Sequence, residues 1–196
     1  MSNDNRLDLT AFSERIATLR THVADNVVGQ SLPVHLLLTA LMADGHVLLE
    51  GVPGVAKTLL AKTLARLVRA DFRRVQFTPD LMPTDVLGTS IFNLGTQQFD
   101  FHPGPVFTQV LLVDEINRAP AKTQAALFEV MEERQVTLDG NTRKLDPCYL
   151  VIATQNPVEQ EGTYRLPEAQ LDRFLLKVEM GYPSHEEELE ILSRYN

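Results

Sequence analysis

The stretch GVPGVAKT occupies residues 51–58, directly after the apolar run HVLLE and directly before a segment with helical spacing. It matches the phosphate-loop pattern G-x-x-x-x-G-K-[ST], except that Ala56 stands in place of the last glycine. In that pattern Gly51 and Gly54 let the backbone wrap close to phosphate oxygens, and amides at the helix start point toward the anion. A tight turn with a surface lysine is the alternative, but the order of strand, loop and helix favours a phosphate site.

The side chains of this loop predict how a nucleotide would be held. Lys57 would neutralise charge on the terminal phosphates, and the Thr58 hydroxyl can ligate Mg²⁺. Because Ala56 stands where the helix begins, we expect it to need no glycine-like, left-handed backbone. We expect nucleotide contacts from the whole loop and the residue after it: Gly51, Val52, Pro53, Gly54, Val55, Ala56, Lys57, Thr58 and Leu59.

A second motif, VLLVDE at 110–115, places two carboxylates after four apolar residues. Asp114 and Glu115 should therefore lie at the carboxyl end of a buried strand, where ligands bind in open α/β sheets. Asp114 would hold Mg²⁺ through its water shell, and Glu115 would act as a general base on the water that attacks the γ-phosphate. Two solvated acids at a strand end are the alternative, which becomes less favoured beside a phosphate loop.

For two further residues the sequence allows more than one role. Asn156, in TQNP after the next apolar strand, could hydrogen-bond the γ-phosphate or the attacking water, but a residue before proline is also typical of a turn. Arg173, in LDRF, could form an ordinary surface ion pair or reach the nucleotide of a neighbouring subunit as an arginine finger.

Outside the motifs, apolar runs alternate with helical patterns, which predicts an α/β sandwich around a mainly parallel sheet. Ser31 is expected to cap the second helix, and Ser184 with Glu187 has the spacing of a capping box before the last one. The expected strands are 46–50, 72–77, 110–113, 149–153 and 175–178; the expected helices include 58–70 and 120–134; hairpins are expected within 90–101 and 135–145.

Composition excludes several classes of protein. The chain has 196 residues, of which 44% are hydrophobic, so a self-sufficient core is expected. Its net charge of −8 argues against a general nucleic-acid binder. Cys148 is the only cysteine, which rules out an intrachain disulfide and fits a reducing compartment, although a secreted protein without disulfides would look the same. With neither a signal-peptide pattern nor a long apolar run, we expect a cytoplasmic protein that does not insert into a membrane.

Taken in order, the phrases GVPGVAKT, FTPDLMPTDVLG, HPGPVF, LLVDEINRAPAKTQAALFEVMEERQVT, ATQNP and EGTYRLPEAQLDRF resemble the MoxR family of AAA+ ATPases. They span almost the whole chain, and together they are far more specific than a phosphate loop alone. Ala56 is usual for that family. The resemblance implies an α/β P-loop NTPase three-layer sandwich, with a five-stranded sheet in the order 5-1-4-3-2 and inserted β-hairpins.

The resemblance also implies an activity and a role for each residue. It implies a hexameric, Mg²⁺-dependent ATPase in which Val28, Gly29 and Gln30 lie near the adenine. The metal would be held by Thr58 and Asp114, and the water by Glu115; Asn156 would be sensor 1, and Arg173 a finger acting in trans. The insert within 78–105 and the hairpin at 135–145 would face the path of a substrate, or be surface decoration.

For the rest of the protein the resemblance implies a division and partners. Residues 1–182 would form the nucleotide-binding core, and 183–196 the start of a truncated helical lid, so that the sensor-2 arginine is absent and hydrolysis of ATP to ADP is weak. The lid-containing protein would be a homo-oligomer that remodels or assembles client complexes, in some relatives with a von Willebrand factor A-domain partner.

Three other functions compete with this one. In a nucleotide-gated binding module, ATP occupancy would control assembly with negligible turnover. A guanine-nucleotide switch is disfavoured because the sequence has no Asn-Lys-x-Asp segment, and a replication helicase or clamp loader is disfavoured by the charge of −8.

Overall fold

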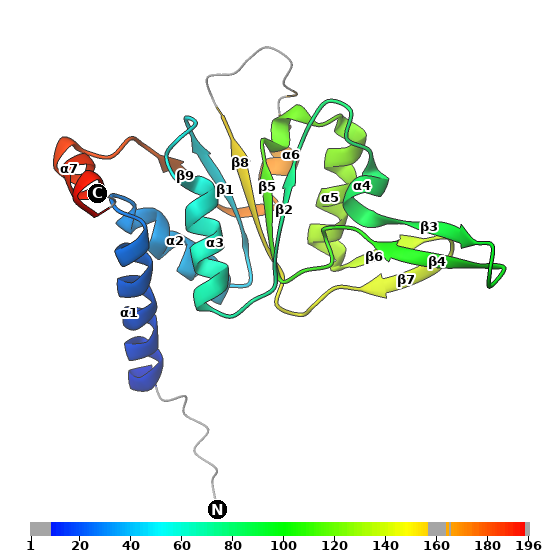
Figure 1. Ribbon diagram of the computed structural model, residues 1–196, viewed down its shortest axis with the longest axis horizontal. Helices are drawn as coiled ribbons and strands as arrows, with labels where there is room; N and C mark the ends of the chain where they lie inside the picture. The colour runs from blue at the N-terminus through cyan, green and yellow to red at the C-terminus, as the bar shows by residue number, and fades with distance from the viewer. Residues whose placement is uncertain (1–8, 157–163, 165, 195–196) are drawn as a thin grey trace, which may run out of the picture.

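A computed structural model describes residues 9–156, 164 and 166–194 (Figure 1). The helices are α1 (Leu9–Asn26), α2 (Ser31–Met42), α3 (Lys57–Leu67), α4 (Pro83–Leu87), the 3₁₀ turn η1 (Ile116–Arg118), α5 (Ala121–Glu133), α6 (Glu168–Leu171) and α7 (His185–Arg194). The strands are β1 (His46–Gly51), β2 (Phe72–Gln76), β3 (Gly88–Asn93), β4 (Gln98–Pro103), β5 (Val110–Asp114), β6 (Gln135–Leu138), β7 (Asn141–Lys144), β8 (Leu150–Gln155) and β9 (Phe174–Met180).

The central sheet has five strands in the order β2-β5-β8-β1-β9. All four neighbouring pairs are parallel. Numbered along the chain as sheet strands, this is the predicted order 5-1-4-3-2, so the predicted fold class is confirmed. The carboxyl ends of β1, β5 and β8 carry the phosphate loop, Asp114 and Asn156, and these strands are neighbours.

Helices cover both faces of the sheet, which gives three layers (Figure 1). Successive residues of a strand face opposite layers. In β1, Val47 and Leu49 therefore pack in the core under α2 and α3, while Leu48 packs in the core under α5. Both cores are almost free of solvent exposure, and they fix the sheet on which the polar loops stand.

Two antiparallel hairpins project from the sandwich, as predicted: β3 with β4, and β6 with β7. They are joined to each other, because the Ser90 hydroxyl donates to Asp139 at 2.6 Å and the Arg143 guanidinium lies 3.9 Å from the centre of the Phe101 ring. The outer part of the first hairpin is exposed and apolar, with Leu94 85% and Phe99 71% accessible.

The start of α2 differs from the prediction. Gln30, not Ser31, is the cap residue, and no side chain caps the helix. The buried Gln30 amide donates instead to the Gly181 carbonyl at 3.3 Å, which ties this turn to the end of β9. The predicted capping box before α7 is confirmed, because the Ser184 amide donates to Glu187 and the Glu187 amide donates to the Ser184 hydroxyl.

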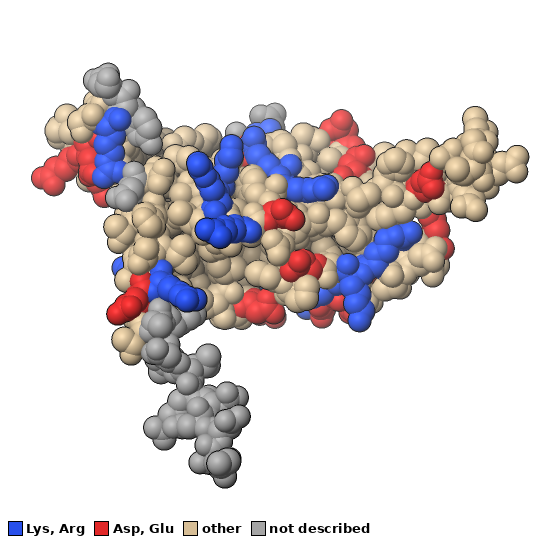
Figure 2. Space-filling model, turned by 60° about the horizontal axis from the view of Figure 1, so that its bottom comes forward, with Lys and Arg blue, Asp and Glu red and all other residues tan. Residues whose placement is uncertain are grey.

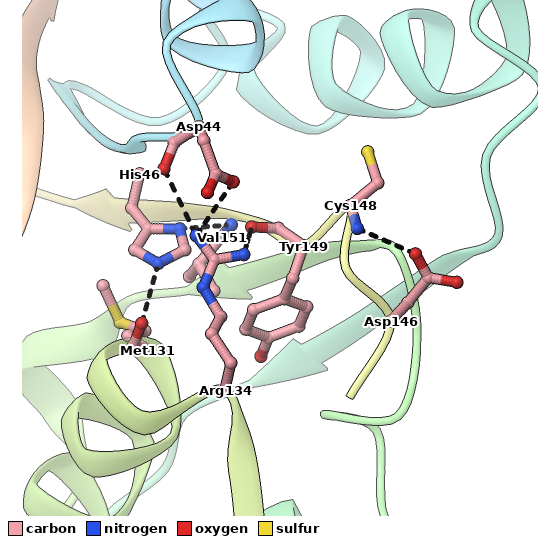
Figure 3. Close-up of polar contacts among 8 residues, drawn as sticks. All are labelled: Asp44, His46, Met131, Arg134, Asp146, Cys148, Tyr149 and Val151. Atoms are coloured by element: carbon pink, nitrogen blue, oxygen red, sulfur yellow. Dashed lines mark hydrogen bonds and ion pairs between the residues drawn. The ribbon is translucent and has the colours of Figure 1, made fainter. Parts of the chain in front are cut away.

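A polar cluster holds the amino end of the sheet, away from the phosphate loop (Figure 3). Arg134, just after α5, donates to the Tyr149 carbonyl at 2.8 Å and pairs with Asp44 at 3.0 Å. The His46 ring is buried, with Nδ1 accepting from the Val151 amide at 3.1 Å and Nε2 lying 3.3 Å from the Met131 carbonyl. The cluster therefore links the end of α5 to the starts of β1 and β8.

Candidate functional site

A cavity of about 400 Å³ opens at the carboxyl ends of the central strands. It brings together most of the residues predicted from the motifs GVPGVAKT, VLLVDE and TQNP. Its lining residues are Pro53, Gly54, Ala56, Lys57, Thr58, Leu59, Arg74, Gln76, Asp114, Glu115, Thr154 and Asn156.

The phosphate loop reaches this cavity through two residues with left-handed backbones. Gly54 has φ +90° and Ala56 has φ 62°. The expectation that Ala56 needs no such conformation is therefore wrong: α3 begins only at Lys57, and Ala56 is its cap residue. The last glycine of the general pattern occupies a position whose backbone an alanine adopts here only at an energetic cost.

Gly51 and Val52 are predicted loop residues that line neither this cavity nor the one beside it. A Cβ atom on Gly51 would lie 2.4 Å from the Met180 carbonyl oxygen. The glycine therefore allows the close approach of β1 to β9. The partly buried Val52 packs against the core under α2 and α3.

Lys57 is one of the cations that line the cavity, another being Arg74. Its ammonium donates to the Gly51 carbonyl at 2.5 Å, so the side chain folds back over the loop. Burial lowers the pKa of Lys57, and the charges of Asp114, Glu115 and Glu50 oppose that effect. A phosphate group would add opposite charge to a partly desolvated cation, which strengthens their interaction.

Asp114 is the most buried carboxylate of the site, at 6% exposed, and both of its oxygens are hydrogen-bonded. Oδ1 accepts from the Thr154 hydroxyl at 3.1 Å, and Oδ2 accepts from Arg74 Nε at 2.5 Å. The Thr154 hydroxyl also accepts from the Glu115 amide at 3.0 Å. One side chain of β8 thus fixes both acidic residues at the end of β5.

Glu115 has a left-handed backbone, with φ 56°, immediately after β5. Its carboxylate accepts from the Gln76 amide at 2.6 Å and pairs with Arg118 at 3.1 Å. Neighbouring polar groups therefore orient the predicted base toward β2 and η1.

The donor set suits Mg²⁺. Thr58 and Asp114 line one cavity, and this ion takes oxygen ligands while keeping several waters when it binds with substrate phosphates. Among the described residues, no group of three or more His, Cys, Asp or Glu side chains could hold a metal by itself. Thr58 and Asp114 therefore fit an ion that arrives with phosphates and water.

A second cavity of about 190 Å³ adjoins the phosphate loop. Val28 and Gln30 of the predicted adenine segment line it, and Gly54, Ala56 and Leu59 line both cavities. The other lining residues are Asn26, Val27, Val55, Pro183 and Ile191. Gly29 does not line it; its φ of 75° turns the chain between Val28 and Gln30.

Of the two candidates with open roles, Asn156 lies in the main cavity and Arg173 lies outside it. Asn156 is buried and lines the main cavity, whereas Pro157 lies outside the described residues. Arg173 lines neither cavity, and its guanidinium pairs with Glu132 at 2.8 Å, both side chains being well exposed. Within one chain the structure thus brings Asn156, but not Arg173, to the predicted site.

Comparison with known proteins decides the family. The model of the "ATPase family associated with various cellular activities (AAA)" matches residues 46–176, which include the phosphate loop, VLLVDE and Asn156. The chain belongs to the AAA ATPase family. The match covers every sheet strand except the end of β9.

Relatives place this AAA protein in the MoxR family, as the motifs predicted. It is 58% identical to the chaperone MoxR1 of Mycobacterium tuberculosis over 86% of its length, and 57% identical to the protein YeaC of Bacillus subtilis over 88%. It spans about half of each relative, 45% of MoxR1 and 54% of YeaC. A crystal structure of a proposed ATPase from Cytophaga hutchinsonii, 48% identical, superposes with a TM-score of 0.79 over 96% of this chain and 59% of the other.

Sequence reasoning missed three side chains in the AAA site: Arg74, Gln76 and Thr154. Arg74 and Gln76 alternate along β2 and so lie on the same face as Asp114, with which Gln76 is in register. That alternation was present in the sequence, but it identifies a cavity only when the partner strand is known. Thr154 lay inside the quoted ATQNP motif, and its hydroxyl is the signal that could have found it.

Proposed function

We propose that this AAA protein binds Mg·ATP in the main cavity and hydrolyses it to ADP and phosphate. The observation that carries the proposal is the convergence of Lys57, Thr58, Asp114 and Glu115 on one cavity, beside a second cavity lined by Val28 and Gln30. The second cavity is lined mainly by apolar side chains and suits a flat base, while the first offers a cation and oxygen donors for phosphates.

The proposed reaction assigns one task to each side chain. Mg²⁺, when held by Thr58 and Asp114, would neutralise charge on the phosphates. Lys57 binds the terminal phosphates, and Asn156 orients the γ-phosphate or the water by hydrogen bonding. Glu115 accepts a proton from the water, whose oxygen bonds to the γ-phosphorus while the bond to the bridging oxygen breaks and ADP leaves with that oxygen.

The test compares two substitutions that should act oppositely on affinity and turnover. Lys57→Ala should weaken Mg·ATP binding by about tenfold or more, because it removes a charge-assisted contact. Glu115→Gln should leave ATP bound and lower phosphate release by about 10²-fold, because it removes a positioned base. Lys62→Ala and Glu129→Gln, both at exposed positions, are the matched controls.

Titration with a fluorescent ATP analogue and a phosphate-release assay are the measurements. Unchanged affinity in Lys57→Ala would mean that the loop is only a turn. Normal phosphate release in Glu115→Gln would remove the catalytic-base assignment and leave the binding assignment standing.

A second function, a nucleotide-gated module with negligible turnover, is favoured by three contacts. The Glu115 carboxylate is held by Gln76 and Arg118, and Arg173 pairs with Glu132 outside the cavity. In a single subunit the base is therefore engaged and the candidate finger is absent. ATP that changes assembly without release of phosphate would support this second function.

For the whole protein we propose a ring oligomer that remodels or assembles client proteins in the cytoplasm, with residues 1–182 as the nucleotide-binding core and 183–196 as the start of a helical lid. The name of the relative MoxR1, a chaperone, supports the client-remodelling role. None of the described helices is long and apolar enough to cross a membrane. A von Willebrand factor A-domain partner and weak hydrolysis by this chain alone stay predictions.

The β3–β4 hairpin supports the client-binding part of this proposal. Figure 2 shows its tip as a projection free of Lys, Arg, Asp and Glu. Ile91, Phe92, Leu94 and Phe99 are at least 46% exposed there, which is an unusual density of apolar side chains on a protruding element. Leu94→Asp combined with Phe99→Asp should abolish photo-crosslinking to an unfolded model protein and leave ATP binding unchanged.

A further inference from the structure

Arg74 is a cation that touches the predicted metal-binding carboxylate, Asp114. Its Nε lies 2.5 Å from Asp114 Oδ2, and its Nη2 lies 3.3 Å from the Gln76 side-chain oxygen. The Arg74 side chain is 51% exposed, whereas the Asp114 side chain is 9% exposed. The guanidinium thus covers a buried carboxylate from the open side of the cavity.

The fold places Arg74 there through strand register. β2 pairs in parallel with β5, with Gln76 opposite Asp114, so Arg74 lies two residues earlier on the same face. The neighbouring Arg73 lies on the opposite face, where its guanidinium donates to the Gly104 carbonyl at 3.3 Å. Adjacent arginines of one strand therefore have different environments, and only Arg74 lines the cavity.

The contact conflicts with the proposed use of Asp114. With Thr154 on one oxygen and Arg74 on the other, the carboxylate has a partner at each atom. A metal ion with its water shell needs one of these oxygens, and its positive charge would be repelled by a guanidinium at hydrogen-bond distance from the same group. Each oxygen keeps a second lone pair, so the neutral Thr154 hydroxyl can stay, whereas the charge of the Arg74 guanidinium competes with the metal for the carboxylate.

We propose that Arg74 is the counter-ion of Asp114 in the nucleotide-free protein and gives up this carboxylate when Mg²⁺ enters with the nucleotide. Arg74 is thus a positioning residue: it holds the Asp114 carboxylate in place while no metal is bound, and it sets the Mg²⁺ concentration at which the site fills. The inference rests on the proposed function, because it assumes that Asp114 serves the metal.

The experiment measures binding of a fluorescent ADP analogue at a series of Mg²⁺ concentrations. Arg74→Gln should lower the half-saturating Mg²⁺ concentration by about fivefold, as expected from removal of a half-exposed competing ion pair. Arg73→Gln is the matched control. It removes the same charge from the same strand but should leave the half-saturating Mg²⁺ concentration unchanged. Arg74→Lys, which keeps the charge, should shift the concentration less than Arg74→Gln.

Thermal unfolding gives a second readout that does not depend on activity. Arg74→Gln should unfold at a lower temperature than wild type without ligand, and this difference should disappear with saturating Mg·ADP, because the wild-type contact is then also broken. A difference that persists with Mg·ADP, or a half-saturating Mg²⁺ concentration that is unchanged or raised, would overturn the proposal.

The outcomes separate this inference from the proposed function. If wild type shows no Mg²⁺-dependent binding of ADP, the nucleotide site itself is wrong and the inference fails with it. If wild type binds and Arg74→Gln behaves as Arg73→Gln does, only the counter-ion role fails. If Arg74→Gln does not fold, the Mg²⁺ titration of Arg74→Lys decides, and an unshifted midpoint overturns the proposal.

Discussion

At the scale of single residues, the site contains two residues other than glycine whose backbone is left-handed. Ala56 and Glu115 have φ of 62° and 56°, and both line the main cavity. A left-handed L-residue costs about 1–2 kcal/mol, a strain that surrounding structure must hold in place. Ala56 turns the chain from the phosphate loop into α3, and Glu115 turns it at the end of β5. The backbone strain is therefore located in residues that line the cavity.

Substitution of Ala56 by glycine tests that strain. Ala56→Gly should raise the free energy of unfolding by about 0.5–1 kcal/mol, because relief of the left-handed alanine exceeds the added flexibility of the unfolded chain. Urea unfolding followed by circular dichroism is the measurement. Ala125→Gly, at an exposed position inside α5, is the control and should lower stability by about 1 kcal/mol. Equal destabilisation by the two substitutions would show that Ala56 is not strained.

At the scale of elements, the cluster around His46 joins the end of α5 to the starts of β1 and β8 (Figure 3), and its buried imidazole predicts that stability depends on pH. Burial lowers the pKa of His46 from 6.5 to about 4, with a smaller lowering by the Arg134 charge that the Met131 carbonyl and Asp44 oppose. The neutral ring suits its contacts, because Nδ1 accepts from the Val151 amide while Nε2 faces the Met131 carbonyl. A second proton on the ring would leave the Val151 amide without its acceptor.

This cluster predicts loss of stability in mild acid. The unfolded chain binds a proton at His46 below about pH 6.5 and the folded chain only below about pH 4, so the contribution is complete above 6.5 and is lost as the pH falls through this window. Between pH 7.5 and pH 5 the loss should be about 2 kcal/mol. Urea unfolding at both pH values measures this loss. The drop in the free energy of unfolding between pH 7.5 and pH 5 should be smaller in His46→Gln than in wild type by about 2 kcal/mol. His35→Gln, which removes an exposed imidazole, is the control, and an unaltered pH dependence in His46→Gln would refute the assignment.

The central strands β1, β5 and β8 were predictable because a buried parallel strand is a continuous apolar run, as in VLLV before Asp114. The short helices α4 and α6 were not expected, since segments of 5 and 4 residues are too short to show helical periodicity. Motif residues of the site were predictable because their order along the chain is itself a signature. Arg74 and Gln76 were not, because their contacts with Asp114 and Glu115 depend on the register of β2 against β5.

At the scale of the whole molecule, one subunit holds almost all of the predicted catalytic set but not Arg173. That guanidinium pairs with Glu132 at the surface and lines neither cavity. An exposed ion pair of this kind contributes little to stability, about 0–1 kcal/mol, so its loss on assembly would be readily offset. Arg173 lies directly before β9, an edge strand of the sheet, which leaves it accessible to a neighbouring copy.

If the protein forms the proposed ring, this arrangement predicts complementation between two variants that are each inactive alone. Arg173→Ala should bind ATP normally and hydrolyse it about 10³-fold more slowly, if its charge stabilises the transition state in the neighbouring subunit. Lys57→Ala should be inactive because it does not hold the phosphates. Mixed rings should regain activity, since a Lys57→Ala subunit can offer its intact Arg173 to the intact phosphate loop of an Arg173→Ala neighbour.

The control for that experiment is Glu132→Gln, which breaks the same surface pair while keeping the arginine. It should retain wild-type turnover, because the proposed role belongs to Arg173 and not to the pair. Phosphate release from mixtures at several ratios, with mixed rings verified by native mass spectrometry, is the measurement. No recovery in verified mixed rings would reject action in trans. Arg173 would then be what the isolated chain displays, one half of a surface ion pair with Glu132.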